Sequence, residues 1–321
     1  RTIMRTSTGK AHWHIVEGVD PYYRSLTVGT LLRDALYGHL ETVRLEQEVK
    51  NRLGPEAAKG SAVEVTAGDG AQAVPSAGEV PVTCVLNSLD MSQALDKKAY
   101  QQQLREYQAR LHLLSRKALK KKVSTILVLE GPDAAGKGGA IRRVTAALDA
   151  RNYQVLPIAA PTDEEKARHY LWRFWRHLSR AGRVTIFDRS WYGRVLVERV
   201  ERFAREEEWK RAYAEINDFE EQLIEHGIVM LKYWVHVTNE EQLARFEARR
   251  ETPHKRWKLT EEDWRNREKW QDYERAVNDM VQHTSTLHAP WTLVEGNDKR
   301  FARVKVIGAL CDRLEAALGK V

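Results

Sequence analysis

The chain has 321 residues, of which 42% are hydrophobic and 30% are charged, and its formal net charge is +7. This composition excludes a collagen-like or disordered chain, and no run of about 18 apolar residues is present for a membrane-spanning helix. The two cysteines, Cys84 and Cys311, have no CxxC or His partner nearby, which argues against a disulfide scaffold or a zinc site. We therefore expect a soluble, cytoplasmic protein whose basic excess favours polyanionic partners.

An internal repeat relates the two ends of the chain. At an offset of 278 residues, 13 of the 31 positions from Thr6 to Leu36 are identical to those of residues 284–314. A period this long indicates that a whole domain has been duplicated. We expect residues 1–53 to be the last strand and helix (Ser25–Leu53) of a truncated upstream duplicate. Residues 54–88 have the composition of a linker, and residues 89–321 are expected to form the catalytic domain.

From Met91 onward, the hydrophobic pattern predicts alternating helices and strands. A helix ends at Lys120-Lys121-Lys122, and apolar runs typical of buried parallel strands follow at 125–130, 154–159, 183–187, 230–237 and 291–295. This alternation predicts an α/β fold with a parallel, doubly wound, five-stranded sheet. Ligands of such a sheet bind at the carboxyl ends of the strands.

A phosphate-binding loop follows the first of these strands. Residues 131–138 read GPDAAGKG, which matches the GxxxxGK spacing of a P-loop, and a helix is expected over 139–150. The backbone N–H groups of such a loop curl around a phosphate, and its lysine supplies positive charge. The phosphate contacts are expected from Gly131, Ala134, Ala135, Gly136, Lys137, Gly138 and Gly139.

Two acidic residues predict a magnesium site. Gly138 stands where a P-loop usually has the hydroxyl residue that contacts Mg²⁺, so another oxygen ligand is required. Asp133 inside the loop is the candidate, unless it serves only to form a turn. Asp188 ends the third strand and is the second candidate ligand.

Two arginines, Arg189 and Arg194, flank the second acidic residue. Arginine binds phosphoryl oxygens with two parallel hydrogen bonds, so these side chains are candidates for a phosphoryl clamp. The alternative is that either one only pairs with Glu198 or Glu201.

Two further segments are basic. Residues 164–180 interleave cations with aromatic residues, and they form either a solvated face or, together with Arg142 and Arg143, a groove for a long polyanion. A capped helix over 242–251, a basic loop and a second capped helix over 264–283 predict a lid at about 239–284. Such a lid excludes water from phosphoryl transfer, unless it is a charged hairpin without a special role.

Four motifs, taken in this order, resemble the family 2 polyphosphate kinases. They are GPDAAGKGG (131–139), FDRSWYGR (187–194), the basic lid (245–258) and PWTLVEGNDKRFAR (290–303). The resemblance covers residues 89–318 and implies a P-loop kinase fold similar to thymidylate kinase, with a helical lid. It also implies Mg²⁺-dependent phosphoryl transfer between inorganic polyphosphate and nucleotides. The duplication resembles the fused polyphosphate:AMP phosphotransferase subgroup, in which one domain, usually the second, is active.

The resemblance also implies roles for individual residues. It assigns Asp133 and Asp188 to Mg²⁺ and Lys137 to phosphate. Acceptor and phosphate positioning fall to Arg189, Arg194 and Glu198. Polyphosphate contacts are implied for Arg142, Arg143, Arg249, Arg250 and Lys258, and the far wall of the nucleotide site for Asp298 and Lys299.

The expected activity is transfer of a phosphoryl group from inorganic polyphosphate to AMP, forming ADP, with Mg²⁺ as cofactor. Neither nucleic acid nor a membrane is an expected partner, and assembly into a homo-oligomer stays open. Two alternatives also stay open. One is an ATP-dependent nucleoside monophosphate kinase, and the other is a non-catalytic P-loop protein that binds polyanions.

Overall fold

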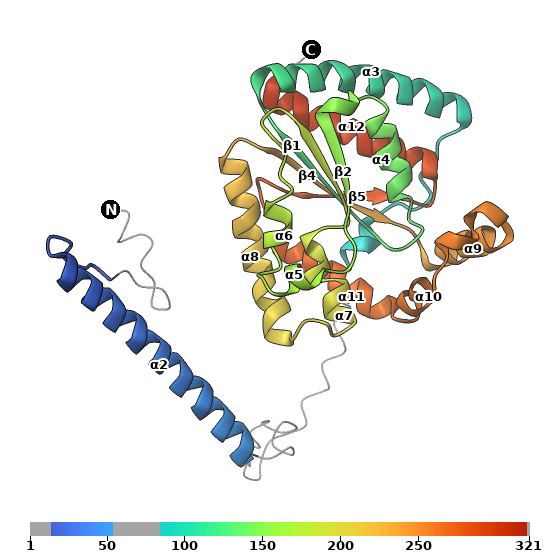
Figure 1. Ribbon diagram of the computed structural model, residues 1–321. Helices are drawn as coiled ribbons and strands as arrows, with labels where there is room; N and C mark the ends of the chain where they lie inside the picture. Colours follow the sequence, from blue (N-terminus) through green and yellow to red (C-terminus); the bar gives the residue numbers. More distant parts are fainter. Residues whose placement is uncertain (1–13, 54–83, 320–321) are drawn as a thin grey trace, which may run out of the picture. The chain divides into compact units, whose positions relative to one another are not determined.

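The computed structural model describes residues 14–53 and 84–319 (Figure 1). The chain divides into two compact units, Arg1–Gly78 and Glu79–Val321. Residues 1–13 and 54–83 lie outside the described residues, so part of the predicted tail and most of the predicted linker lie there too. Among the helices that the structure describes, none is long and apolar enough to cross a membrane.

The first unit contains one long helix, α2 (Pro21–Leu53), which starts four residues before the predicted Ser25. The carboxylate of Asp20 accepts the N–H groups of Tyr22 (2.8 Å) and Tyr23 (3.2 Å) and so caps the helix. Residues 14–18, within the described part of the repeat, adopt no strand. The helix of the repeat is thus observed, and its strand is not.

The second unit is built on five parallel strands in the order β2-β3-β1-β4-β5. The five apolar runs therefore predict the strands correctly, with boundaries shifted by at most two residues. In the register, Leu129 of β1 lies opposite Asp188 of β3, and Glu130 lies opposite Trp234 of β4. The strands are β1 (Thr125–Glu130), β2 (Tyr153–Pro157), β3 (Val184–Asp188), β4 (Val229–His236) and β5 (Trp291–Glu295).

Helices cover both faces of this sheet (Figure 1). Along β1, Leu127 and Leu129 face one core and Ile126 and Val128 face the other, as alternation along a strand requires. The doubly wound fold predicted from the sequence is confirmed. One face carries α3 (Lys97–Lys121), α4 (Lys137–Thr145) and α12 (Lys299–Leu318), and the other carries α8 (Glu206–Glu225) and α11 (Trp270–Thr284).

Short elements connect these layers. The last residues of the predicted linker pack against α11, because Leu86 is buried and the Val85 N–H donates to Asn278 Oδ1 at 2.8 Å. The short elements are η2 (Val85–Ser88), η3 (Ala150–Asn152), α5 (Asp163–Lys166), α6 (Trp172–Trp175), η4 (Trp191–Arg194), α7 (Val197–Val200), α9 (Asn239–Glu251), η5 (Pro253–Lys258) and α10 (Glu261–Glu268).

Two of the helical segments differ from the sequence prediction. The helix predicted over 264–283 is two helices, because the backbone at Lys269 (φ −96°, ψ 25°) leaves the helical range between α10 and α11. The basic segment 164–180 forms only the single turns α5 and α6. In this segment Arg168 and Arg176 both lie over the ring of Trp172, at 4.0 and 4.7 Å, and both pair with Glu164. These contacts favour the solvated face over the predicted groove for a polyanion.

Candidate active site

The P-loop links β1 to α4 through a backbone that few residues adopt. Gly131 has φ +148°, and a Cβ there would lie 2.3 Å from the carbonyl oxygen of Val235. Ala134 and Gly136 also have positive φ, +62° and +112°. Alternating backbone conformations of this kind turn successive N–H groups toward one anion. Lys137 begins α4, and its ammonium donates to the carbonyls of Gly131 (2.5 Å) and Pro132 (3.2 Å).

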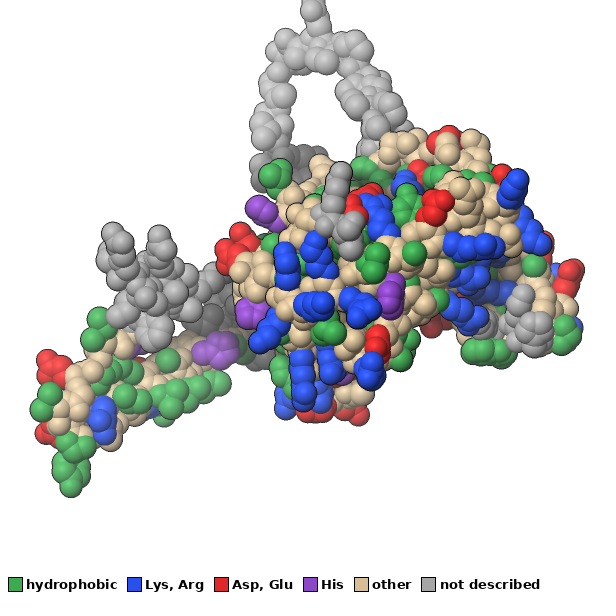
Figure 2. All heavy atoms as spheres, turned by 90° about the horizontal axis from the view of Figure 1, so that it is seen from above, with side chains coloured by type: hydrophobic (Ala, Val, Ile, Leu, Met, Phe, Trp, Pro, Cys, Tyr) green, Lys and Arg blue, Asp and Glu red, His purple; other side chains and the backbone are tan. Residues whose placement is uncertain are grey.

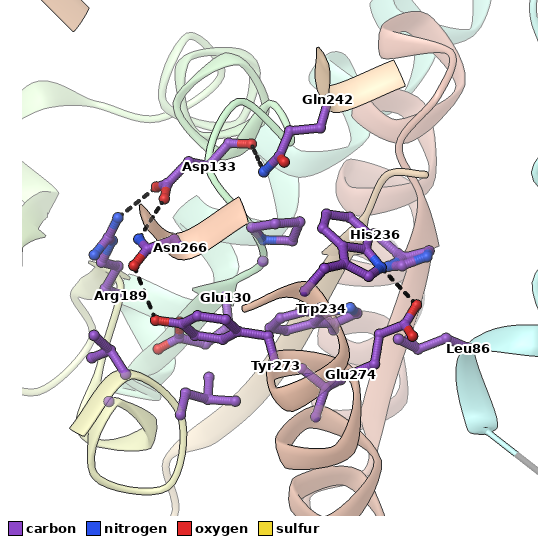
Figure 3. Close-up of a pocket in the computed structure, with 17 residues that line it drawn as sticks. Leu86, Glu130, Asp133, Arg189, Trp234, His236, Gln242, Asn266, Tyr273 and Glu274 are labelled. Atoms are coloured by element: carbon purple, nitrogen blue, oxygen red, sulfur yellow. Dashed lines mark hydrogen bonds and ion pairs between the residues drawn. The ribbon is translucent and has the colours of Figure 1, made fainter. Parts of the chain in front are cut away.

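The carboxylate of Asp133 is the centre of a polar network (Figure 3). Arg189 donates to its Oδ1 at 2.6 Å, and Asn266 donates to its Oδ2 at 3.0 Å. Tyr273 in turn donates its hydroxyl to Asn266 at 3.2 Å. Burial acts to raise the pKa of Asp133, but the charges of Lys137 and Arg189 outweigh it and hold that pKa below its usual value. The network therefore joins the P-loop, the end of β3 and the lid.

Three acidic side chains surround the ammonium of Lys137. Burial and the charge of Arg189 lower the pKa of Lys137, and Asp133, Asp188 and Glu130 oppose this shift. Glu130 is buried at the end of β1, where desolvation raises its pKa and the hydroxyl of Ser190 donates to it at 2.8 Å. Lys137 is thus held charged mainly by the carboxylates around it.

Asp133 and Asp188 offer the oxygen ligands that Mg²⁺ prefers. Within residues 14–53 and 84–319 no group of three His, Cys, Asp or Glu side chains is arranged to hold a metal ion. Mg²⁺ is commonly held by one or two carboxylates and completes its shell with water and substrate phosphates. Two carboxylates beside a P-loop therefore fit Mg²⁺ better than they fit a zinc or calcium site.

A buried ion pair anchors the loop that carries Asp188 and Arg189. Lys232, on β4, donates to Glu220 at 2.7 Å, and both side chains are almost fully buried. Glu220 also accepts the indole N–H of Trp191 (3.0 Å) and the hydroxyl of Tyr192 (2.7 Å). Because a buried charge without a partner is costly, this cluster fixes the segment directly after β3 in one position. Arg189 itself has φ +67°, a strained backbone typical of functional loops.

Arg194 is placed differently from Arg189. Its guanidinium pairs with Glu198 at 3.2 Å and lies 4.5 Å from the centre of the Tyr170 ring. The structure thus contains the pairing with Glu198 that the sequence left open. Arg189, by contrast, pairs with Asp133.

A cavity opens beside the P-loop (Figure 3). Its polar end is formed by Asp133, Arg189 and Asn266. Its apolar walls come from β4, η4, α7 and α11. We call it the acceptor cavity; its other lining residues are Leu86, Glu130, Gly131, Pro132, Gly193, Leu196, Val197, Trp234, His236, Gln242, Trp270, Tyr273, Glu274 and Val277.

The deep wall of this cavity carries two buried polar atoms without a hydrogen-bond partner in the described part of the chain. They are Nε1 of Trp234 and Nδ1 of His236. Burial lowers the pKa of His236 to about 4, so its ring is neutral at pH 7. Trp270 nearby donates its indole N–H to Glu274 at 2.8 Å.

Cations lie on and beside the P-loop helix α4. We call Arg142, Arg249, Lys299 and Arg303 the cationic group; in the described ranges, none of their side chains makes a hydrogen bond or an ion pair. Arg303 lies beside the P-loop helix, since a Cβ at Gly139 would be 3.3 Å from its Nη2. Burial, followed by the charge of Arg245 and those of Arg303 and Arg249, lowers the pKa of Lys299. Figure 2, which looks onto the α3 side of this unit, shows a face rich in Lys and Arg side chains.

Residues 94–320 match the family polyphosphate kinase 2 (PPK2). The chain belongs to this family. A relative from Pseudomonas aeruginosa named polyphosphate:AMP phosphotransferase is 52% identical over 320 residues, which are 100% of this chain and 60% of the relative. A solved chain from Pseudomonas aeruginosa PA01 superposes with a TM-score of 0.81 at 50% identity, over 98% of this chain and 61% of that one. Polyphosphate kinase 2 from Arthrobacter aurescens TC1 gives 0.70 at 36% identity, over 74% and 87%.

The PPK2 chain spans about 60% of the length of the relatives named polyphosphate:AMP phosphotransferase from two Pseudomonas species. Its match to the family falls entirely within the second unit, Glu79–Val321. The resemblance drawn from the four motifs is therefore confirmed at the level of the family.

The remaining residues predicted for the PPK2 site lie around the P-loop and its neighbouring helices. Arg143 turns inward, toward the hydroxyl of Tyr100 and the carbonyl of Gly139 (both 3.4 Å), whereas Arg142 is exposed. Asp298 caps α12 by accepting the N–H of Phe301 at 2.7 Å. Arg250 is exposed, and the side chain of Lys258 lies outside the described ones.

Sequence reasoning missed several residues of the PPK2 site. Arg303 was seen only as part of a motif, although its unpaired guanidinium lies beside α4. Asn266, Trp270 and Tyr273 lie within the predicted lid and reach Asp133 or the cavity only through the fold. Asn266 is on α10 and the other two are on α11, so no single helical spacing could have grouped them.

Proposed function

We propose that this chain transfers the terminal phosphoryl group of inorganic polyphosphate to AMP and forms ADP, with Mg²⁺ as cofactor. The observation that carries the proposal is that the P-loop and its helix α4 adjoin both the cationic group and the acceptor cavity. An in-line phosphoryl transfer needs a donor and an acceptor on opposite sides of the transferred group. The arrangement supplies two such sides.

The cationic group is the side for polyphosphate. Its four side chains make no ion pair in the described chain, and Arg249 and Arg303 act against the charged form of Lys299, although Glu241 favours it, so a bound anion would relieve repulsion there. Arg142 extends this group along α4. A flexible polyanion with one charge per phosphate can neutralise these cations better than a single nucleotide can.

The acceptor cavity is the side for AMP. Its polar end presents the guanidinium of Arg189, which binds the acceptor phosphate after exchanging Asp133 for it. Its apolar walls, among them Leu196, Val197 and Trp270, cover the nucleoside. Glu198 lies behind this wall and positions Arg194.

Catalysis rests on charge neutralisation. Lys137 leaves the carbonyls of Gly131 and Pro132 for the transferred phosphoryl group, and the P-loop N–H groups hold that group in place. The acceptor oxygen is aligned by Arg189. Asp133 and Asp188 hold Mg²⁺, which supplies additional positive charge to the phosphate oxygens when bound.

The test is chromatography of the nucleotides after the protein is mixed with Mg²⁺, AMP and either long-chain polyphosphate or ATP. ADP formed from polyphosphate in the absence of ATP is the expected result, and a Lys137→Met variant serves as the blank. ADP formed only with ATP would replace the proposal by an ordinary nucleoside monophosphate kinase. No product with either donor would refute the proposed activity of this chain.

A further inference from the structure

The guanidinium of Arg245 on α9 is saturated by partners inside the protein. Its side chain is 5% exposed. Nη1 donates to the carbonyls of Ala134 and Ala135, both at 2.9 Å, and Nη2 donates to Gly296 (2.6 Å) and Asn297 (2.8 Å). Nε pairs with Glu241 at 2.6 Å. A guanidinium has five N–H bonds, so no donor of Arg245 is left for a substrate.

Two of these bonds end on a strained part of the P-loop. Ala134 has φ +62°, a left-handed conformation that is strained for a residue with a Cβ. In Figure 3, Gln242, one helical turn before Arg245, donates to the carbonyl of Asp133 at 3.1 Å. The carbonyls of three successive P-loop residues are therefore bound by α9. The N–H of Ala135 donates to the carbonyl of Pro132 at 3.2 Å, and the N–H groups of Asp133 and Ala134 are left for an anion.

We propose that Arg245 is a positioning residue that holds Ala134 in the left-handed conformation and so keeps the P-loop shaped for phosphate before any substrate binds. The first two turns of α9 and the residues after β5 belong to this fixed frame, since the same guanidinium joins them to the loop. The proposal rests on the proposed function in that the bound anion is polyphosphate.

Arginine is required in this role because its five N–H donors point outward in the plane of the guanidinium and so reach several acceptors at once. Lysine carries the same charge but has one nitrogen and three donors, so it cannot supply the five bonds that Arg245 makes. Arg249, one turn further along α9, has no partner in the described chain, although its residue type and helix are the same. The two arginines therefore have separable effects.

The test is a double-mutant cycle between Arg245 and Ala134, read as affinity for tripolyphosphate by calorimetry without nucleotide. Arg245→Met is expected to weaken binding about 30-fold. Ala134→Gly in the Arg245→Met background is expected to recover about fivefold, because glycine adopts positive φ without strain. Ala135→Gly, the matched control, removes the same methyl group from the neighbouring residue and is expected to recover nothing.

A purely structural role for Arg245 predicts the opposite pattern. Extra glycine then only loosens the loop, and both glycine variants weaken binding equally. That result overturns the proposal. If Arg245→Met fails to fold by circular dichroism, the same cycle is run with Arg245→Lys, for which the same recovery is expected.

The outcomes separate this proposal from the proposed function. If Arg245 and Ala134 are coupled in tripolyphosphate binding but the wild-type protein forms no ADP, the positioning role of Arg245 stands and the proposed AMP activity is refuted. If the wild type forms ADP but the two residues are not coupled, the proposed activity stands and the positioning role is refuted. A wild-type protein that does not bind tripolyphosphate overturns both.

Discussion

The two sides of the P-loop treat their charges in opposite ways. On the side of α4, α9 and α12, the four cations of the cationic group have no partner in the described chain. On the side of the acceptor cavity, Arg189 is paired with Asp133, and Asn266 and Tyr273 complete the network. Both sides meet at the same phosphate loop.

This difference indicates two kinds of ligand. Unpaired cations repel one another, and a bound polyanion removes this repulsion. A polyanion should therefore bind them strongly in low salt and with little dependence on its chain length. Paired groups must exchange partners, which favours a ligand of defined size that replaces each lost bond. The predictions below separate the two sides, beginning with the residues that serve both.

The largest effect is expected at the carboxylates between the two sides. Asp133→Asn and Asp188→Asn each keep the shape of the side chain but remove the charge that Mg²⁺ requires. We expect kcat to fall about 10³-fold or more in either variant while the thermal unfolding profile stays close to wild type. Single-turnover assays with polyphosphate and AMP measure this. Activity within tenfold of wild type would remove the carboxylate from the metal site.

The next effect is expected on the cavity side. Arg189→Lys retains a charge but loses the two parallel hydrogen bonds of a guanidinium. The expected loss in kcat/KM for AMP is about 100-fold, with KM for polyphosphate within about threefold of wild type. Initial rates with each substrate varied in turn provide the comparison. An equal rise in the KM values for AMP and for polyphosphate would show that Arg189 does not act on the AMP side alone.

A smaller effect is expected on the cationic side. Arg303→Ala should raise KM for polyphosphate about tenfold and reduce the slope of log KM against log salt by about one, with KM for AMP unchanged. Arg313→Ala is the matched control, because it removes the same charge from α12 at a residue bound to the carbonyl of His288. Indistinguishable salt slopes for the two variants would argue against a phosphate contact at Arg303.

The smallest effect is a pH dependence at Lys299. Its pKa is lowered by burial and by the neighbouring arginines, so its charge is lost at a lower pH than that of an ordinary lysine. KM for polyphosphate should rise about threefold as pH increases through this lowered pKa, because the neutral amine no longer attracts phosphate. Lys299→Arg stays charged and should flatten this rise. An unchanged profile would place Lys299 away from the polyanion.

Local patterns predicted most of the fold. Buried strands appear as apolar runs, and the P-loop follows from its glycines, one of which, Gly131, admits no side chain beside Val235. The helices of the repeat start at equivalent positions, Pro21 in α2 and Lys299 in α12, although the sequence predicted a start at Ser25 for the first. In α2 Leu32 and Leu36 are exposed, whereas their counterparts Leu310 and Leu314 in α12 are buried.

The site was less predictable because its residues meet across long stretches of chain. Asn266 reaches Asp133 from 133 residues away, and no spacing in the sequence reports that contact. Arginines were also ambiguous: Arg245 binds backbone carbonyls and Glu241, whereas Arg303 binds nothing in the described chain. Residue type alone does not separate a cation that shapes the backbone from one that awaits a substrate.

The most direct test of the two-sided account is a calorimetric titration of tripolyphosphate into the wild-type protein saturated with AMP, without Mg²⁺ so that no transfer occurs. The account predicts one site for tripolyphosphate, with an affinity within about tenfold of that measured without AMP, since the two phosphates repel each other but occupy different sides. Loss of tripolyphosphate binding in proportion to AMP occupancy would mean that both ligands compete for one side of the P-loop, and would contradict the account.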